Sequence, residues 1–161
     1  MKGEYTAALW IGFAIGVSLL VAGCIYPESK GDYSREKDQI EQRLQQVIVA
    51  AETKDFDRLD SYHLYGPKFT KFTGTSSERL NAAAGRDGEH KGLGAAKGLN
   101  MKADALKIDM FGNVGVATFI LDYSFESGGQ TIRRRERTTM VFVKDAGEWK
   151  IAHEHLSPIK E

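Results

Sequence analysis

Residues 105–156 read ALKIDMFGNVGVATFILDYSFESGGQTIRRRERTTMVFVKDAGEWKIAHEHL, and this stretch decides the fold. Apolar and polar side chains alternate along it, as they do in half-buried β-strands, and glycine-containing turns interrupt the alternation. The stretch therefore predicts four antiparallel strands joined by short hairpins. The expected strands are Ala105 to Met110, Val114 to Phe125, Ile132 to Lys144 and Glu148 to Leu156.

The last hairpin fixes which residues we expect to lie side by side. With Asp145 to Gly147 as a three-residue loop, Lys144 pairs with Glu148. Side chains two residues apart share a face of a strand, so one face is expected to carry Trp149, Ile151, His153 and His155. The same register predicts the neighbours Val141 and Ile151, Thr139 and His153, and Arg137 and His155.

Helical patterns come before the strands. Apolar residues from Ile40 to Ala51 recur at helical spacing, which predicts an amphipathic helix over residues 35 to 53. Asp55 or Asp57 can cap a second, shorter helix that carries Phe56 and Leu59 and stops before Gly66-Pro67. A strand at residues 68–72 follows. Residues 74–98 are interpreted as a loop with weak helix near 77–84 and 93–99. Helices first and an antiparallel meander afterwards is an α+β order.

Composition excludes several function classes. Acidic and basic residues balance at 22 each, so no overall positive field attracts nucleic acid, and we expect no nucleic-acid partner. The single cysteine excludes an intrachain disulfide and a multi-cysteine metal site. No metal site and no cofactor are expected, because a third ligand beside His153 and His155 is not evident.

The first two dozen residues differ from the rest. An uncharged apolar run ends at Val21-Ala22-Gly23-Cys24, which is similar to the lipobox of bacterial lipoproteins. The resemblance implies a signal peptide at 1–23, an acylated Cys24 and a tether over 24–34. We expect a protein of the cell envelope, attached to the membrane by lipid. The residue after the cysteine is Ile25 and not the Asp that resembles an inner-membrane retention signal. The resemblance therefore implies the periplasmic face of the outer membrane if the source is Gram-negative.

Residues 35–158 resemble the SnoaL-like proteins of the nuclear transport factor 2-like superfamily. The resemblance rests on the ending GEWKIAHEHLS at residues 147–157, on GPKFTKF at 66–72 and on RTTMVF at 137–142. The association domain of calcium/calmodulin-dependent protein kinase II has a similar ending. The resemblance implies a cone-shaped fold of about three helices wrapped by a strongly curved sheet, an internal pocket and frequent dimerisation. It implies no single activity, because superfamily members include enzymes, carriers and assembly modules.

The predicted register suggests a ligand site on one face of the last two strands. An apolar patch with converging polar groups is what a small-molecule site needs, and the basic side chains favour a small polar or anionic ligand. The competing interpretation is that the histidines are buried and hydrogen-bonded within the protein, without a ligand. Trp149 is expected to lie in the core. The predicted ligand-binding residues are Arg137, Thr139, His153, His155, Trp149, Tyr65 and His63.

Two function classes stay open at the level of sequence. The first is a non-catalytic binding or association module, which forms a homodimer because both faces of the strand around Phe119 and Ile120 are apolar. The second is an isomerase, dehydratase or hydrolase that uses His153 or His155 as general base, with Asp60 as a further catalytic candidate. The sequence favours the first.

Overall fold

The computed structural model describes residues 32–160, and these form one unit of helices and strands with its own core. The predicted signal peptide, Cys24 and most of the tether lie outside the described residues. In the described part, no helix is both long and apolar enough to span a membrane. In chain order the elements are α1 (Ser34–Thr53), α2 (Phe56–Ser61), β1 (Thr70–Phe72), α3 (Ala82–Ala95), β2 (Lys97–Phe111), β3 (Val114–Ser127), β4 (Gln130–Asp145) and β5 (Glu148–Pro158).

The strands form one five-stranded sheet in the order β1-β5-β4-β3-β2. The four long strands pair antiparallel, as the alternation predicted, whereas the short β1 pairs parallel with β5 at the edge. β2 begins at Lys97, eight residues before the predicted strand, and its register shifts twice. Gly98 and Ala105 lie at these shifts with φ of 57° and 53°, and such bulges bend a strand. The predicted α+β fold with a curved sheet is confirmed.

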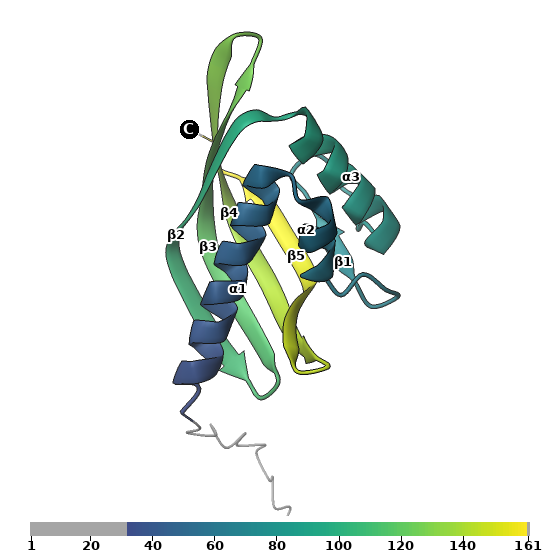
Figure 1. Ribbon diagram of the computed structural model, residues 1–161, viewed down its shortest axis with the longest axis vertical. Coiled ribbons are helices and arrows are strands. Elements are labelled where there is room, and N and C mark those ends of the chain that lie inside the picture. The colour runs from purple at the N-terminus through teal and green to yellow at the C-terminus, as the bar shows by residue number, and fades with distance from the viewer. Residues whose placement is uncertain (1–31, 161) are drawn as a thin grey trace, which may run out of the picture. The chain divides into compact units, whose positions relative to one another are not determined.

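Helix α1 lies against one face of this sheet (Figure 1). Its buried side chains include Ile40, Leu44, Val47 and Ile48, the positions that the helical spacing predicted. They pack on buried side chains of β3, β4 and β5, and we call this side of the sheet its helix-facing side. The sheet contributes Ala117, Phe119, Leu121, Met140, Phe142, Trp149 and Ile151 to the core.

The short helix α2 begins as predicted. The Asp55 carboxylate accepts a hydrogen bond of 3.2 Å from the backbone N–H of Arg58, which satisfies one of the free donors at the start of the helix.

The sequence predicted a loop with two weak helices in this region, but the structure has a single helix, α3. It runs unbroken from Ala82 to Ala95, and the Asn81 side chain caps it by accepting from the N–H of Ala84. Its four glycines weaken it intrinsically, so contacts from other segments must hold it. His90 lies 2.8 Å from Asp60 and stacks on Phe56, and Lys54 donates to the carbonyl of Gly94. Helix propensity depends on the residues of the segment itself and takes no account of contacts with distant residues. The sequence prediction therefore failed here.

The predicted register of the last hairpin is wrong. Its turn has two residues, Ala146 and Gly147, both with positive φ, so Asp145 pairs with Glu148. A bulge then shifts the register. Phe142 pairs with Ile151 and Val141 pairs with His153, so Ala152 has no partner on β4. The bulge also ends the alternation. Trp149 and Ile151 are buried on the helix-facing side, and beyond the bulge the buried residue is Glu154.

Candidate functional site

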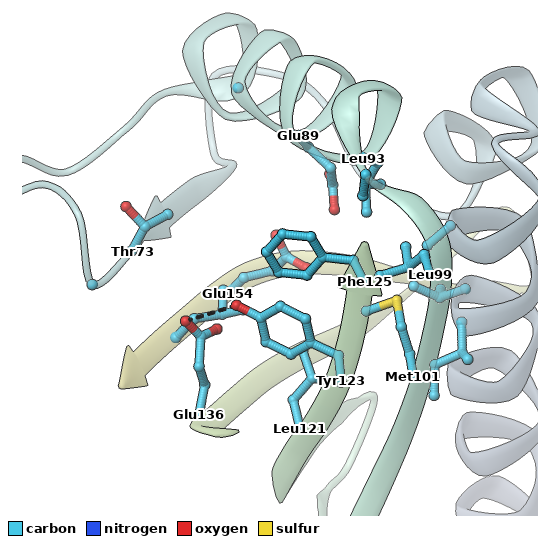
Figure 2. A pocket seen from close by; sticks show the side chains of 18 of the residues that line it. Thr73, Glu89, Leu93, Leu99, Met101, Leu121, Tyr123, Phe125, Glu136 and Glu154 are labelled. Carbon is cyan, nitrogen blue, oxygen red and sulfur yellow. Dashed lines mark hydrogen bonds between the residues drawn. The ribbon is translucent and has the colours of Figure 1, made fainter. Parts of the chain in front are cut away.

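A cavity of about 570 Å³ lies between α1, α3 and the helix-facing side of the sheet. Figure 2 shows Leu93 at the end of α3, Leu99 and Met101 on β2, and Tyr123 and Phe125 on β3 around this space. Most of the other side chains that line it are apolar, among them Leu44, Ile48, Phe119, Leu121, Met140 and Leu156. A cavity of this size and lining has the usual properties of a small-molecule site.

Charged and hydrogen-bonding groups also reach the cavity. Figure 2 shows Glu89, Glu136 and Glu154 around it, from α3, β4 and β5. The Tyr123 hydroxyl donates to Oε1 of Glu136 over 3.4 Å. Burial raises the pKa of the Glu136 carboxyl above its usual range, although the bond from Tyr123 opposes the shift. Burial and the neighbouring carboxylate raise the pKa of Tyr123 to about 12, so its hydroxyl keeps its proton.

Behind one wall of the cavity lies a buried charge network. Glu154 is only 2% exposed, and Lys71, on the facing position of β1, is 7% exposed. The Lys71 Nζ lies 2.6 Å from Glu154 Oε2 and 3.5 Å from Glu89 Oε1. His63 Nε2 lies 3.5 Å from Glu154 Oε1, and the Tyr65 hydroxyl donates to Glu89 over 3.0 Å. The network joins α3, β1 and β5 at the cavity.

The charges in this network stabilise one another against burial. Burial alone would raise the pKa of Glu154, but Lys71 and His63 outweigh it and hold that pKa below its usual range. Burial would lower the pKa of Lys71, yet Glu154 and Glu89 raise it, so the amine stays protonated. A protonated lysine is not a nucleophile, so the ion pairs of Lys71 disfavour Schiff-base chemistry at this residue.

His63 is held in one orientation. Its Nδ1 lies 2.9 Å from the carbonyl oxygen of Leu59, which can only accept, so Nδ1 carries a proton. Nε2 faces Glu154 Oε1 and needs a second proton to donate to it. Burial opposes this charge, but the hydrogen bond to Glu154 and the two neighbouring carboxylates prevail and raise the pKa of His63. The structure therefore favours an imidazolium ion.

This network predicts a dependence of stability on pH. Since the pKa of His63 is raised above the ordinary 6.5, its contribution is complete below that pH and is lost as the pH rises through the raised pKa. Urea unfolding at a series of pH values should give a free energy of unfolding that falls above about pH 6.5. His63→Gln should remove that slope, whereas the exposed His155→Gln should keep it. An unchanged slope in His63→Gln would contradict the assignment.

Three side chains of the network could also ligate a metal ion. The ligand atoms of His63, Glu89 and Glu154 lie within 4.8 Å of one another. However, the Lys71 ammonium already lies between the carboxylates of Glu89 and Glu154. A divalent ion would have to displace a buried positive charge, so the residues present do not fit a metal centre.

The predicted ligand-binding residues do not line the cavity. Past the bulge, His153 accepts from or donates to the Thr70 hydroxyl at 2.7 Å, and Phe72 packs on the rings of both His153 and His155. His155 and Arg137 are exposed, and Thr139 pairs with His155 on the same outer side of the sheet. Burial and His155 lower the pKa of His153.

The remaining predicted residues lie in the core or beside the cavity. Trp149 is buried, as expected, and its indole N–H donates to Gln39. His63 and Tyr65 stack on each other and belong to the charge network rather than to the cavity lining. Asp60, a predicted catalytic candidate, pairs with His90 and thereby holds α3. Whether any of these residues touches a ligand stays a prediction.

Sequence reasoning missed the polar residues of the cavity. Lys71 offered a signal, because it shares a strand face with Phe69 and so points to the buried side, where a lysine needs a partner. Glu154 offered none, because the bulge at Ala152 changes its face. Glu136 lies in a run of arginines that is typical of an exposed strand end.

Known structures share this fold at low sequence identity. A proposed dehydratase of the nuclear transport factor 2-like family from Streptomyces avermitilis is 14% identical, with a TM-score of 0.71, and the match covers 80% of this chain and 99% of that one. A nuclear transport factor 2-like superfamily protein from Salmonella enterica is 21% identical, with a TM-score of 0.71 and coverages of 80% and 94%. The calcium/calmodulin-dependent protein kinase II hub homology domain of Chlamydomonas reinhardtii is 16% identical, with a TM-score of 0.66 and coverages of 78% and 99%.

These matches account for almost the whole of each known chain. The known chains therefore consist of little beyond this fold, and residues 32–160 of the present chain contain all of its elements. No curated protein matches the sequence. The family model of the SnoaL-like domain matches residues 40–161, and the chain therefore belongs to the SnoaL-like family, within the nuclear transport factor 2-like fold.

Proposed function

We propose that this protein is a binding module of the cell envelope whose cavity holds a small, largely apolar molecule with one polar end. The observation that supports the proposal most strongly is the cavity of about 570 Å³, with apolar walls and a few converging polar groups. Burying the apolar part of a ligand there supplies affinity, and the polar groups fix its orientation. Membrane attachment through Cys24 would keep the module near apolar molecules.

The cavity does not favour the anionic ligand expected from the sequence. That expectation rested on Arg137, His153 and His155, which lie on the outer side of the sheet. The carboxylates of Glu89, Glu136 and Glu154 reach the cavity instead. They would repel an anion, because the single lysine among the lining residues is already paired with Glu154.

An apolar neutral probe tests the proposal. Calorimetric titration of 1-octanol into the fragment 32–161 should show saturable binding. Replacing two lining residues at one end of the cavity, Leu93→Trp with Leu99→Trp, should weaken binding by at least about tenfold, since bulky rings occupy the space.

The matched control places the same rings outside the cavity. Val49 and Phe111 are 54% and 66% exposed, so Val49→Trp with Phe111→Trp should leave octanol binding unchanged. Circular dichroism should show that both double variants are folded. If the unmodified fragment gives no saturable heat with 1-octanol, the binding function is wrong.

Self-association through the outer side of the sheet belongs to the same proposal. Val116 and Val141 are neighbours there and, like Ile120, are only partly exposed. One helical layer covers the opposite side, so this apolar surface is free to pack on a second copy. The likeness to a hub homology domain supports this arrangement. Light scattering on the fragment should return a dimer at high micromolar concentration, and a monomer there would contradict it.

An enzyme is the second candidate, and for it we propose Glu136 as catalytic base in place of His153 or His155. His153 and His155 do not line the cavity, whereas Glu136 does and has a carboxyl with a raised pKa beside the Tyr123 hydroxyl. A carboxyl so placed can transfer a proton at a ligand in an apolar cavity. Loss of turnover in Glu136→Gln, with binding retained, would favour the enzyme over the binding module.

A further inference from the structure

The charges that face the cavity are unequal in number. Its lining residues include four carboxylates, from Glu89, Glu126, Glu136 and Glu154, against one ammonium, from Lys71. Lys71 already forms ion pairs with Glu154 and Glu89. The buried His63 adds one positive charge behind the wall, and it also faces Glu154. The cavity therefore keeps a negative potential, which low-polarity walls strengthen.

Glu136 is the partly buried carboxylate of this set that has no ion-pair partner in direct contact among the described residues; the charge of Lys71 acts on it only from a greater distance. Within residues 32–160 it forms no ion pair, and its hydrogen bond comes from the Tyr123 hydroxyl over a long 3.4 Å. That bond reaches one oxygen, Oε1, so the other oxygen has no protein donor. A half-buried carboxylate with a free oxygen gains from a positively charged partner because burial has removed part of its hydration.

Glu154 places a second carboxylate on the same side of the cavity (Figure 2). Its Oε2 is buried and lies 2.6 Å from the Lys71 ammonium, which is its ion-pair partner. Figure 2 shows the Tyr123 hydroxyl and the Glu136 and Glu154 carboxylates at the polar side of the space, with Leu99, Met101 and Leu93 across from them. Charged acceptors thus lie on one side of the cavity and apolar walls on the other.

We propose that the cavity selects amphiphilic amines, whose ammonium group pairs with Glu136 in the field of Glu154 while the apolar part lies against Leu99, Met101 and Phe125. This inference rests on the proposed binding function and names its ligand class. Tyr123 acts as a positioning residue, because its hydroxyl holds one oxygen of Glu136 and leaves the other for the ligand. A carboxylate ligand of the same length is disfavoured, since it would bring a further negative charge among the glutamates.

Three probes with the same eight-carbon chain and different head groups test the inference on the fragment 32–161. Calorimetry should rank octylamine above 1-octanol and 1-octanol above octanoate, with octylamine at least about tenfold tighter than the alcohol. Glu136→Gln should remove the preference for the amine and leave 1-octanol binding nearly unchanged. Glu136→Asp, which keeps the charge, should retain the preference.

A matched control separates a local ion pair from the total charge of the molecule. Glu78 is exposed and is not among the lining residues, so Glu78→Gln should bind octylamine as the unmodified fragment does. If 1-octanol binds as tightly as octylamine, or if Glu136→Gln keeps the preference, the amine inference is overturned while the binding function stands. If none of the three probes binds, the binding function itself fails.

Discussion

Lys71→Met is expected to lower the free energy of unfolding of the fragment 32–161 by about 3–5 kcal/mol, the usual loss when one partner of a buried ion pair is removed. The methionine fits the apolar surroundings, but it leaves Glu154 at 2% exposure with His63 as its remaining cation. Glu89 loses the same partner. Such a loss is a large part of the stability of a domain of this size, so urea unfolding should show it clearly.

Two further variants make that result specific. Lys102 is exposed and pairs with Asp104 at the surface, so Lys102→Met should change the free energy of unfolding by less than about 1 kcal/mol. Combining Lys71→Met with Glu154→Leu removes both charges of the pair, leaves Glu89 near His63, and should recover part of the loss. A single Lys71→Met that costs less than about 1 kcal/mol would mean that the pair is not buried as described.

Cys24→Ser is expected to abolish lipid attachment and so to change where the protein is found. The prediction follows from the lipobox-like residues 21–24. These residues lie outside the part of the chain that the structure describes. In a bacterial host, label from a radioactive fatty acid should enter the unmodified chain and not the variant. The variant should remain unprocessed or appear as a soluble exported form.

Ser29→Ala, in the predicted tether, is the control and should be labelled normally. An unmodified protein that takes up no label and retains residues 1–23 would show that the lipoprotein assignment is wrong. The cavity and its proposed ligand would not be affected, because they belong to residues 32–160 alone.

The fold could be predicted largely because local patterns carry it. The helical spacing from Ile40 to Ala51 and the alternation along β3 are both set by which face is buried, and burial dominates their energetics. The third helix could not be predicted in this way. Its four glycines argue against a helix. The helix is stabilised instead by contacts from Asp60, Phe56 and Lys54, which precede their partners by 30 to 40 residues in the sequence.

The site could not be predicted because it depends on two small irregularities. A two-residue turn at Ala146-Gly147 moves the pairing of β5 by one residue, and the bulge at Ala152 then exchanges the faces of Glu154 and the histidines. A register error of one residue turns every side chain of a strand to the other face. A buried carboxylate such as that of Glu154 is costly without partners, and the structure supplies those partners in Lys71 and His63.

The most direct test of the central claim, that the cavity holds a ligand, uses the three methionines of the fragment 32–161. Met101 and Met140 line the cavity, whereas Met110 does not and lies instead beside Gly115 and Ile40. With carbon-13 methyl labels, titration of octylamine should give saturable shifts of the Met101 and Met140 signals, and the Met110 signal should stay in place. Shifts of equal size at all three methionines, or none at Met101 and Met140, would contradict the claim.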